Sequence, residues 1–331
     1  MSQLEIEAAA FDMVEQRGRV VMDKVEQKLL TTSYDNGIIA SALQYYAKSN
    51  LPLVLPLFPA LISLSYEVVA GSQETGGFES VATAMMLIAL SADIHDDIID
   101  QSTVKYAKKT IYGKFGSEIA LLAGDALLIQ GHALLHQACE AFSPKQRQEL
   151  SVLIPKALFE LSAAEVLERQ LSKKSVIEPE EYFEIIRLKG VFAELQCRIG
   201  GIIGRADDET LEAIAIYGRT VGLLGTIKDE FSDVTNIPEL THRMQYECPP
   251  LPVVYAIRNE EVKMLVDEFV KQLTSKVAVK KFAAIVLESE GVCDLKHKIS
   301  EQVTQKLKDW ILTRKNRAGH DAALLLQAFS S

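Results

Sequence analysis

Apolar residues recur at helical spacing along most of the chain, and this pattern predicts helices almost throughout. In residues 4–30, apolar positions such as Phe11, Val14, Val21 and Val25 stand three, seven and four residues apart among charged ones, as on one face of an amphipathic helix. A longer apolar run at 81–90 is rich in Ala, Met and Leu rather than in the β-branched residues that favour strands. No stretch alternates in the manner of a strand, so we expect an all-α protein.

Glycine and proline predict where further helices begin and end. The apolar segment 116–141 reads as a helix interrupted at Gly124-Asp125, and Ser143-Pro144 begins a helix that runs to about residue 173. Glu178-Pro179 opens another helix, which carries Lys189 and ends near the glycines of 199–204. No stretch has the composition of a linker. We therefore expect one domain over residues 1–331.

The uncharged segment 51–66 raises the question of a membrane. It holds only 16 residues, whereas a spanning helix needs about 20, and it contains Pro52, Pro56 and Pro59. Proline removes a backbone donor and breaks helical hydrogen bonding. The sequence therefore predicts a buried, kinked segment here and no transmembrane segment.

An acidic cluster ends the apolar run at 81–90. Asp96 and Asp100 are four residues apart and lie on one face of a helix, with Asp97 beside them. Carboxylates so close repel one another unless a cation lies between them. Mg²⁺ prefers such hard oxygen ligands and completes its shell with water and substrate phosphates. The cluster therefore predicts a Mg²⁺ site that binds a phosphorylated substrate.

A second acidic cluster ends the apolar segment 213–227. Asp229 and Asp233 again stand four residues apart, with Glu230 beside them. Two such helices facing each other across a bundle would make a cavity with two acidic walls, bridged by metal ions and a diphosphate. The alternative interpretation is two acidic helix ends in contact with water.

The net charge and the cysteines indicate which kinds of partner and which compartment to expect. A net charge of −10 argues against nucleic acid, and a negative protein that acts on a negative substrate needs metal counter-ions. The four cysteines are scattered without metal-ligand spacing, and no secretory signal precedes them. Thiols of this kind are typical of a reducing cytoplasm, where we expect the protein to be.

Four features occur here in the order in which they occur in trans-isoprenyl diphosphate synthases, the polyprenyl synthetase family. They are the segment His95–Asp100, Gly124-Asp125, Lys189 within a helix, and the segment Asp229–Asp233. The chain resembles a divergent archaeal or bacterial member of this family, which includes geranyl, farnesyl and geranylgeranyl diphosphate synthases. These enzymes join an allylic diphosphate to isopentenyl diphosphate.

The resemblance implies a class I isoprenoid-synthase bundle of helices around a central apolar pocket, usually in a homodimer. It further implies two or three Mg²⁺ ions, with Mn²⁺ as a substitute. The implied metal ligands are Asp96, Asp97, Asp100, Asp229, Glu230 and Asp233. Catalysis would rest on Asp96, Asp97, Asp100 and Lys189, and the metal ions and lysines would stabilise the leaving diphosphate.

The resemblance also implies contacts with the substrates. Lys48, Lys105 and Lys189 match family positions that hold diphosphates, and His95 either contacts metal or diphosphate or only donates a hydrogen bond. The isopentenyl diphosphate site departs from the family, because Leu51 stands where an arginine is usual. Ionisation of an allylic diphosphate is thus better supported than condensation with isopentenyl diphosphate.

Product length in this family depends on residues that precede the first acidic cluster. Ser91 and Ala92 are small where bulky residues would block the pocket floor, and Ile88 and Met85 lie one and two turns deeper. We therefore expect a product of twenty carbons or more.

Two alternatives stay open at this point. The first is a class I terpene synthase, or a prenyltransferase with another acceptor, which the loss of the arginine at Leu51 favours. The second is a non-catalytic regulatory subunit of a heteromeric synthase, against which the complete first acidic cluster argues.

Overall fold

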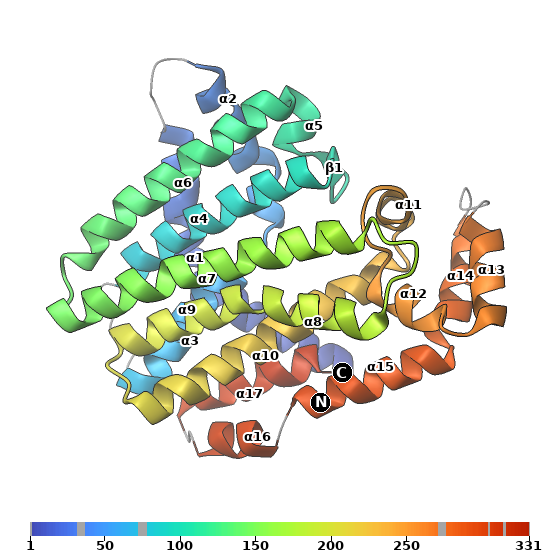
Figure 1. Ribbon diagram of the computed structural model, residues 1–331. Helices are drawn as coiled ribbons and strands as arrows, with labels where there is room; N and C mark the ends of the chain where they lie inside the picture. Colours follow the sequence, from blue (N-terminus) through green and yellow to red (C-terminus); the bar gives the residue numbers. More distant parts are fainter. Residues whose placement is uncertain are drawn as a thin grey trace. The chain divides into compact units, whose positions relative to one another are not determined.

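The computed structural model describes residues 2–31, 37–71, 78–270, 276–303, 305–313 and 316–330 of the chain. Helices make up nearly all of this described part (Figure 1). They are α1 (Gln3–Thr31), α2 (Ile38–Ser49), the 3₁₀ helix η1 (Leu51–Leu53), α3 (Leu57–Ala70), α4 (Phe78–Ile99), α5 (Ile111–Phe115), α6 (Ser117–Cys139), α7 (Pro144–Leu171), α8 (Pro179–Lys189), α9 (Val191–Ile203), α10 (Asp208–Asp233), α11 (Ile237–Tyr246), α12 (Leu251–Ala256), α13 (Glu260–Val270), α14 (Lys276–Leu287), α15 (Glu290–Gln302), α16 (Gln305–Leu312) and α17 (Arg317–Phe329). The predicted all-α class is confirmed.

One small hairpin departs from the expectation that no strand forms. Strand β1 (Val104–Lys105) pairs antiparallel with β2 (Lys108–Lys109). The two residues between them, Tyr106 and Ala107, have φ values of 50° and 61°. Positive φ at both central residues matches the twist of a tight two-residue hairpin. Strands of two residues are too short to produce an alternating pattern, so they could not be predicted from the sequence.

Backbone contacts divide the chain into two compact units. Unit 1 comprises Met1–Val152, Gln196–Ile214 and Asn316–Asp321, and unit 2 comprises Leu153–Leu195, Ala215–Lys315 and Ala322–Ser331. The first acidic cluster lies in unit 1 and the second in unit 2. The single domain expected over 1–331 stays a prediction.

Helix α4 forms the core of unit 1 and packs against α1, α3 and α6. Its residues 81–88 are all buried. Figure 1 shows α4 and α6 side by side. Helix α6 is continuous through Gly124-Asp125, where the sequence analysis placed an interruption. Gly124 is used instead for close packing, because a Cβ atom there would lie 2.4 Å from His95 Nε2 of α4.

Unit 2 is built on α8, α10, α12 and the helices that follow. Tyr182 and Phe183 of α8 share a buried cluster with Leu223 and Ile227 of α10 and with α12. The single helix expected over 178–204 is broken at Gly190, which separates α8 from α9. A Cβ atom on Gly190 would lie 2.9 Å from the Arg219 carbonyl oxygen, so the break lies where two backbones come close.

The apolar segment 51–66 is kinked, as predicted. The stretch Ile38–Leu53 and the following helix Leu57–Ala70 meet at an angle of 65°. By length and composition alone, however, two described helices, α4 and α6, are long and apolar enough to cross a membrane, and this bent pair would count as a third. In the structure 72% of the apolar window of α4 is buried, against 33% of that of α6. The absence of a transmembrane segment stays a prediction.

Candidate functional site

The last two turns of α4 present the first acidic cluster. Asp97 is 2% exposed, whereas Asp96 is half-buried. The chain leaves the helix at Asp100, whose backbone N–H donates to the Asp96 carbonyl at 2.9 Å. The Ser102 N–H donates to the Asp97 carbonyl at 2.8 Å and so folds the hairpin back toward the helix.

The hairpin brings Lys105 to this cluster. Its Nζ atom lies 2.8 Å from Asp97 Oδ1 and 3.0 Å from Asp93 Oδ1. Tyr46 of α2 donates from its hydroxyl to the other oxygen of Asp93, at 3.0 Å. Lys105, expected to bind a diphosphate, is therefore paired with two carboxylates. Asp93 and Tyr46 were not among the predicted site residues, although the spacing of Asp93 and Asp97 on one helix face was a readable signal.

Burial dominates the ionisation of this group. Burial and, to a smaller extent, the charge of Asp93 together raise the pKa of Asp97 to about 7, against the lowering effect of Lys105. Burial alone would lower the pKa of Lys105, but Asp93 and Asp97 together hold it well above its usual value. Lys105 is thus an ammonium held by the carboxyl groups of Asp93 and Asp97 in a poorly hydrated environment.

Asp96 offers an oxygen that suits a cation. Its Oδ1 atom is buried and accepts no hydrogen bond from any described residue. An anionic oxygen cut off from water is costly unless it is paired. Mg²⁺ therefore fits the Asp96 side of the cluster, with Asp100 one turn away on the same face. The described part of the chain shows no group of three or more His, Cys, Asp or Glu side chains already arranged around a metal position.

His95 lies beside α6. Its Nε2 atom is 3.4 Å from Asp125 Oδ1 and 3.4 Å from the Leu121 carbonyl oxygen. The Gly124-Asp125 pair is thus explained locally, because the glycine makes room for the imidazole and the aspartate contacts it. A role of His95 toward substrate stays a prediction.

Few of the positions expected to bind isopentenyl diphosphate carry a basic side chain. Lys48 is exposed near the end of α2 and makes no ion pair or hydrogen bond with a described residue. Leu51, at the usual arginine position, is 4% exposed and begins η1. That position belongs to the core of unit 1, which explains why an apolar residue is accommodated there.

The residues expected to set product length lie on the buried part of α4. Met85, Ile88 and Ser91 are each 1% exposed, and Ala92 is half-buried. Ile88 packs against α6, where a Cβ atom on Gly131 would lie 2.7 Å from Ile88 Cγ1. Their role in product length stays a prediction.

The second acidic cluster is held by an arginine that was not predicted. Arg243 of α11 is 4% exposed, and its Nη1 atom lies 2.8 Å from both Glu230 Oε1 and Asp233 Oδ2. Glu230 is 6% exposed and also accepts the Leu251 N–H at 2.6 Å. Asp229 has neither contact and is exposed. Because Arg243 stands ten residues after Asp233 and is part of no repeat, its place could not be read from the sequence.

Lys189 is linked to the same cluster. Its Nζ atom lies 3.0 Å from Glu165 and also pairs with Glu168. Glu168 in turn accepts the Tyr182 hydroxyl at 3.1 Å, and that hydroxyl accepts from Arg243 at 2.6 Å. Although burial raises the pKa of Glu168, the charges of Lys189 and Arg243 lower it on balance. The residue expected to hold a diphosphate is therefore positioned by two glutamates.

Asp229 is the carboxylate of this cluster that is most open to solvent. Desolvation by the surrounding groups and the charges of Asp233 and Glu230 nevertheless together raise its pKa to about 6. A cation beside Asp229 would remove this repulsion. The Asp229 edge therefore also fits a metal ion, whereas Glu230 does not, because its oxygens are already occupied.

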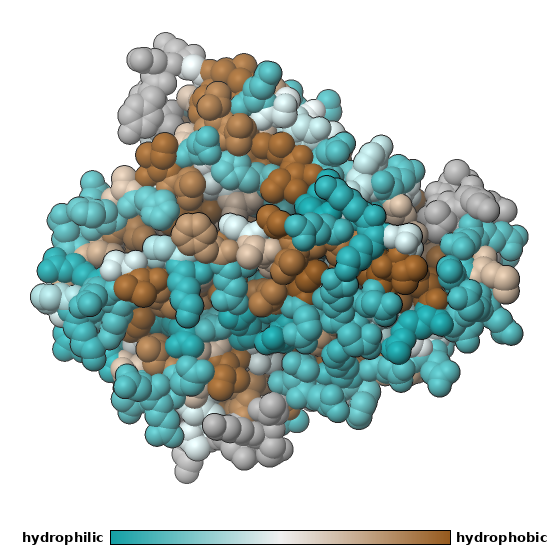
Figure 2. All heavy atoms as spheres, in the orientation of Figure 1, coloured by the Kyte–Doolittle hydropathy of each residue, from teal (hydrophilic) through white to brown (hydrophobic). Residues whose placement is uncertain are grey.

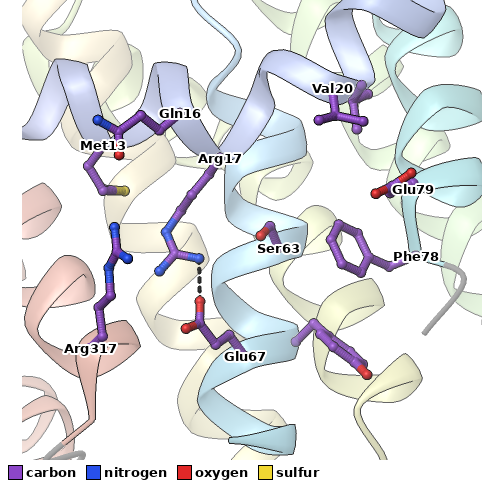
Figure 3. Close-up of a pocket in the computed structure, with 11 residues that line it drawn as sticks. Met13, Gln16, Arg17, Val20, Ser63, Glu67, Phe78, Glu79 and Arg317 are labelled. Carbon is purple, nitrogen blue, oxygen red and sulfur yellow. Dashed lines mark hydrogen bonds and ion pairs between the residues drawn. The ribbon is translucent and has the colours of Figure 1, made fainter. Parts of the chain in front are cut away.

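A separate pocket of about 360 Å³ lies in unit 1, away from the acidic cluster (Figure 3). It is lined by residues of α1, α3, the start of α4 and the start of α17. Its Arg17 side chain, which is 7% exposed, bonds Glu67 at 2.5 Å and Asp321 at 2.6 Å. These bonds tie three helices of the unit together, so we assign Arg17 a structural role.

Comparison with known proteins identifies the family. The model of the polyprenyl synthetase family matches residues 41–286, well over half of the chain. The chain belongs to the polyprenyl synthetase family. This match, together with relatives from archaea and bacteria, confirms the family predicted from the acidic clusters.

Curated relatives are similar over different shares of their length. The chain is 25% identical to the geranylfarnesyl diphosphate synthase of Aeropyrum pernix, over 72% of the chain and 78% of the relative. It is 27% identical to the geranylgeranyl diphosphate synthase of Methanosarcina mazei, over 57% of each. It is 24% identical to heptaprenyl diphosphate synthase component 2 of Bacillus subtilis, over 73% of the chain and 68% of the relative. All three names are of the enzyme class predicted from the sequence, the prenyltransferases.

A solved structure supports the fold. The crystal structure of geranylgeranyl pyrophosphate synthetase from Pyrococcus horikoshii matches 98% of this chain and 98% of its own, with a TM-score of 0.79 at 22% identity. This likeness confirms the predicted helical-bundle fold.

Proposed function

We propose that the protein is a Mg²⁺-dependent trans-prenyltransferase that ionises an allylic diphosphate and condenses it with isopentenyl diphosphate. The observation that carries this proposal is the buried Asp96 Oδ1 at the end of α4, which accepts no hydrogen bond from the described residues, in a member of the polyprenyl synthetase family. Asp96 and Asp100 would hold the metal in unit 1, and Asp229 with Asp233 would hold it in unit 2. Mn²⁺ is a substitute with the same preference for oxygen.

The metal ligands and the lysines would have different roles in the reaction. Bound Mg²⁺ supplies positive charge that stabilises the leaving diphosphate. Lys189, fixed by Glu165 and Glu168, would add an ammonium toward that diphosphate, and Lys105 would do so from the hairpin. Asp97 would act through Lys105, because its Oδ1 oxygen pairs with that ammonium.

We propose a product of twenty carbons or more. The support is the small size of Ser91 and Ala92 on α4, together with relatives named for geranylgeranyl and geranylfarnesyl products.

We also propose a homodimer in the cytoplasm. Leu121, Leu122 and Ile129 are exposed on α6, and Figure 2 shows hydrophobic side chains gathered on this face.

The test uses purified protein with Mg²⁺ and radiolabelled isopentenyl diphosphate, supplied in turn with allylic diphosphates of five to twenty carbons. We expect labelled, longer prenyl diphosphates that disappear in Asp96→Asn and persist in Asp208→Asn, an exposed aspartate on α10. Diphosphate release without incorporation of label would contradict condensation.

A second candidate has a specific observation in its favour. Leu51 is buried and Lys105 is already paired, so few cations are left for a second diphosphate. This favours ionisation followed by cyclisation or by transfer to another acceptor, which the same assay reveals as release without label. A chain that is inactive alone but alters the products of an active homologue would instead support the regulatory subunit. The reason to test a regulatory subunit is that one relative is named heptaprenyl diphosphate synthase component 2.

A further inference from the structure

Arg243 uses all its hydrogen-bond donors inside unit 2. It donates from Nε to the Cys248 carbonyl at 3.1 Å, from Nη1 to Glu230 and Asp233 at 2.8 Å each, and from Nη2 to Tyr182 at 2.6 Å and Glu230 at 3.1 Å. An arginine carries five N–H donors in a planar fork, and these five bonds account for them. A lysine could not reproduce this set, since its ammonium has three donors and no fork.

The same contacts occupy Glu230. Its Oε1 atom accepts from Arg243, and its Oε2 atom accepts from Arg243 and from the Leu251 N–H. Tyr182 lies 3.3 Å and 3.4 Å from the two oxygens. A metal ion bound to Glu230 would displace a guanidinium that is itself buried, and would leave that charge unpaired. Glu230 therefore does not fit the metal-ligand role that its position in the cluster predicts.

The network also reaches Lys189. From Arg243 it passes through the Tyr182 hydroxyl to Glu168, and from Glu168 to the Lys189 ammonium. These groups come from α7, α8 and α11. One buried arginine thus neutralises two carboxylates of the second acidic cluster and is linked, through Tyr182, to one of the two glutamates that position Lys189.

We propose that Arg243 is a resident cation of the second acidic cluster, and that Glu230 is a positioning residue rather than a metal ligand. Arg243 neutralises Glu230 and one oxygen of Asp233. Metal at this cluster is then held through Asp229 and the remaining oxygen of Asp233. This inference deepens the proposed function and rests on it for the identity of the metal.

The first arm of the test measures stability without metal. Thermal unfolding is followed for wild type, Glu230→Gln, Arg243→Met and the double variant, with Arg258→Met as the control. Arg258 makes an exposed ion pair with Glu180 at 3.5 Å. We expect each single variant at the network to lower Tm by about 3 °C or more, the control to change it little, and the double variant to lose less than the sum. If the Tm loss of the double variant equals the sum of the losses of the two single variants, Arg243 and Glu230 do not stabilise each other, and the role of Arg243 as a resident cation is overturned. If Arg243→Met does not fold, Arg243→Lys replaces it, and failure to lower Tm would be equally decisive.

The second arm counts bound Mn²⁺ by the electron paramagnetic resonance signal of free Mn²⁺, with and without inorganic pyrophosphate. We expect Glu230→Gln to keep the wild-type number of ions, with affinity within about twofold, and Asp229→Asn to weaken binding by about tenfold, which is 1.4 kcal/mol. Loss of an ion in Glu230→Gln would overturn the inference while leaving the proposed function intact. Absence of Mn²⁺ binding in wild type would overturn the proposed function and the metal part of the inference, and the stability arm would still decide the role of Arg243.

Discussion

The ammonium of Lys105 lies 2.8 Å from Asp97 Oδ1, so the second carboxylate of the first acidic cluster has a cation of its own. Glu230, at the equivalent place in the second cluster, is paired with Arg243 in the same way. In each unit the second acidic position is buried and neutralised by a basic residue, while Asp96 and Asp229 keep oxygens available. The two clusters therefore share an internal division between carboxylates that are paired with a basic residue and carboxylates that the proposed function assigns to the metal.

Lys105→Met should destabilise the protein, because it leaves Asp97 buried without its main counter-ion. We expect a loss of about 2 kcal/mol in the free energy of unfolding, measured by urea titration. The figure is lower than for a fully buried pair, because the Lys105 side chain is 29% exposed. Lys108→Met, on the exposed strand of the same hairpin, is the control and should change stability little. Equal effects would show that the pair contributes nothing.

The contribution of Asp97 to stability should fall as pH rises from about 4 to about 7. The pKa of Asp97 is raised from 3.8 to about 7 in the folded protein. Between those values the folded state binds more protons at this carboxyl than the unfolded state, so deprotonation favours unfolding. Unfolding free energies measured at intervals over this range should give a steeper decline in wild type than in Asp97→Asn. Parallel curves would contradict the raised pKa.

Gly124→Ala should be destabilising by about 1–3 kcal/mol, because its Cβ atom would lie 2.4 Å from the His95 ring. The double variant Gly124→Ala with His95→Ala should recover most of the loss. Gly225→Ala is the matched control: it is also a helical glycine, but a Cβ atom there meets nothing within 4 Å. Thermal unfolding should rank the control at or above wild type, since alanine favours helix. A destabilised control, or no recovery in the double variant, would remove the steric explanation.

Ala92→Phe should shorten the products if the half-buried face of α4 lines the prenyl chain. We expect the main product to fall below twenty carbons with the rate of the first condensation largely kept. Products would be separated by length by reversed-phase thin-layer chromatography. Val152→Phe on the exposed face of α7 is the control and should leave the lengths unchanged. An unaltered distribution in Ala92→Phe would place the chain elsewhere.

Much of the fold and part of the site could be predicted because they depend on local pattern. The apolar run before Asp96 identified α4, and helical spacing grouped Asp96 with Asp100. The hairpin was missed because its strands hold two residues each. The break at Gly190 was missed because it depends on an approach to the Arg219 backbone.

Pairings between distant segments could not be predicted in the same way. Lys105 was expected to hold a diphosphate, whereas its pairing with Asp93 depends on how the hairpin folds back. Arg243 and Tyr182 come from helices that no motif connects to Glu230. A single sequence records which residues carry charge, and the fold decides which charges neutralise one another.

The two close approaches between α4 and α6 have a mechanical consequence. Ile88 packs at Gly131 and His95 packs at Gly124, so residues seven apart on one helix meet glycines seven apart on the other. Close contacts at two points along a pair of antiparallel helices fix both the axial offset and the relative rotation of the two helices. A slide of one helical turn, about 5.4 Å, would bring both side chains against larger residues. Any rearrangement of unit 1 during turnover must therefore carry α4 and α6 as one rigid piece.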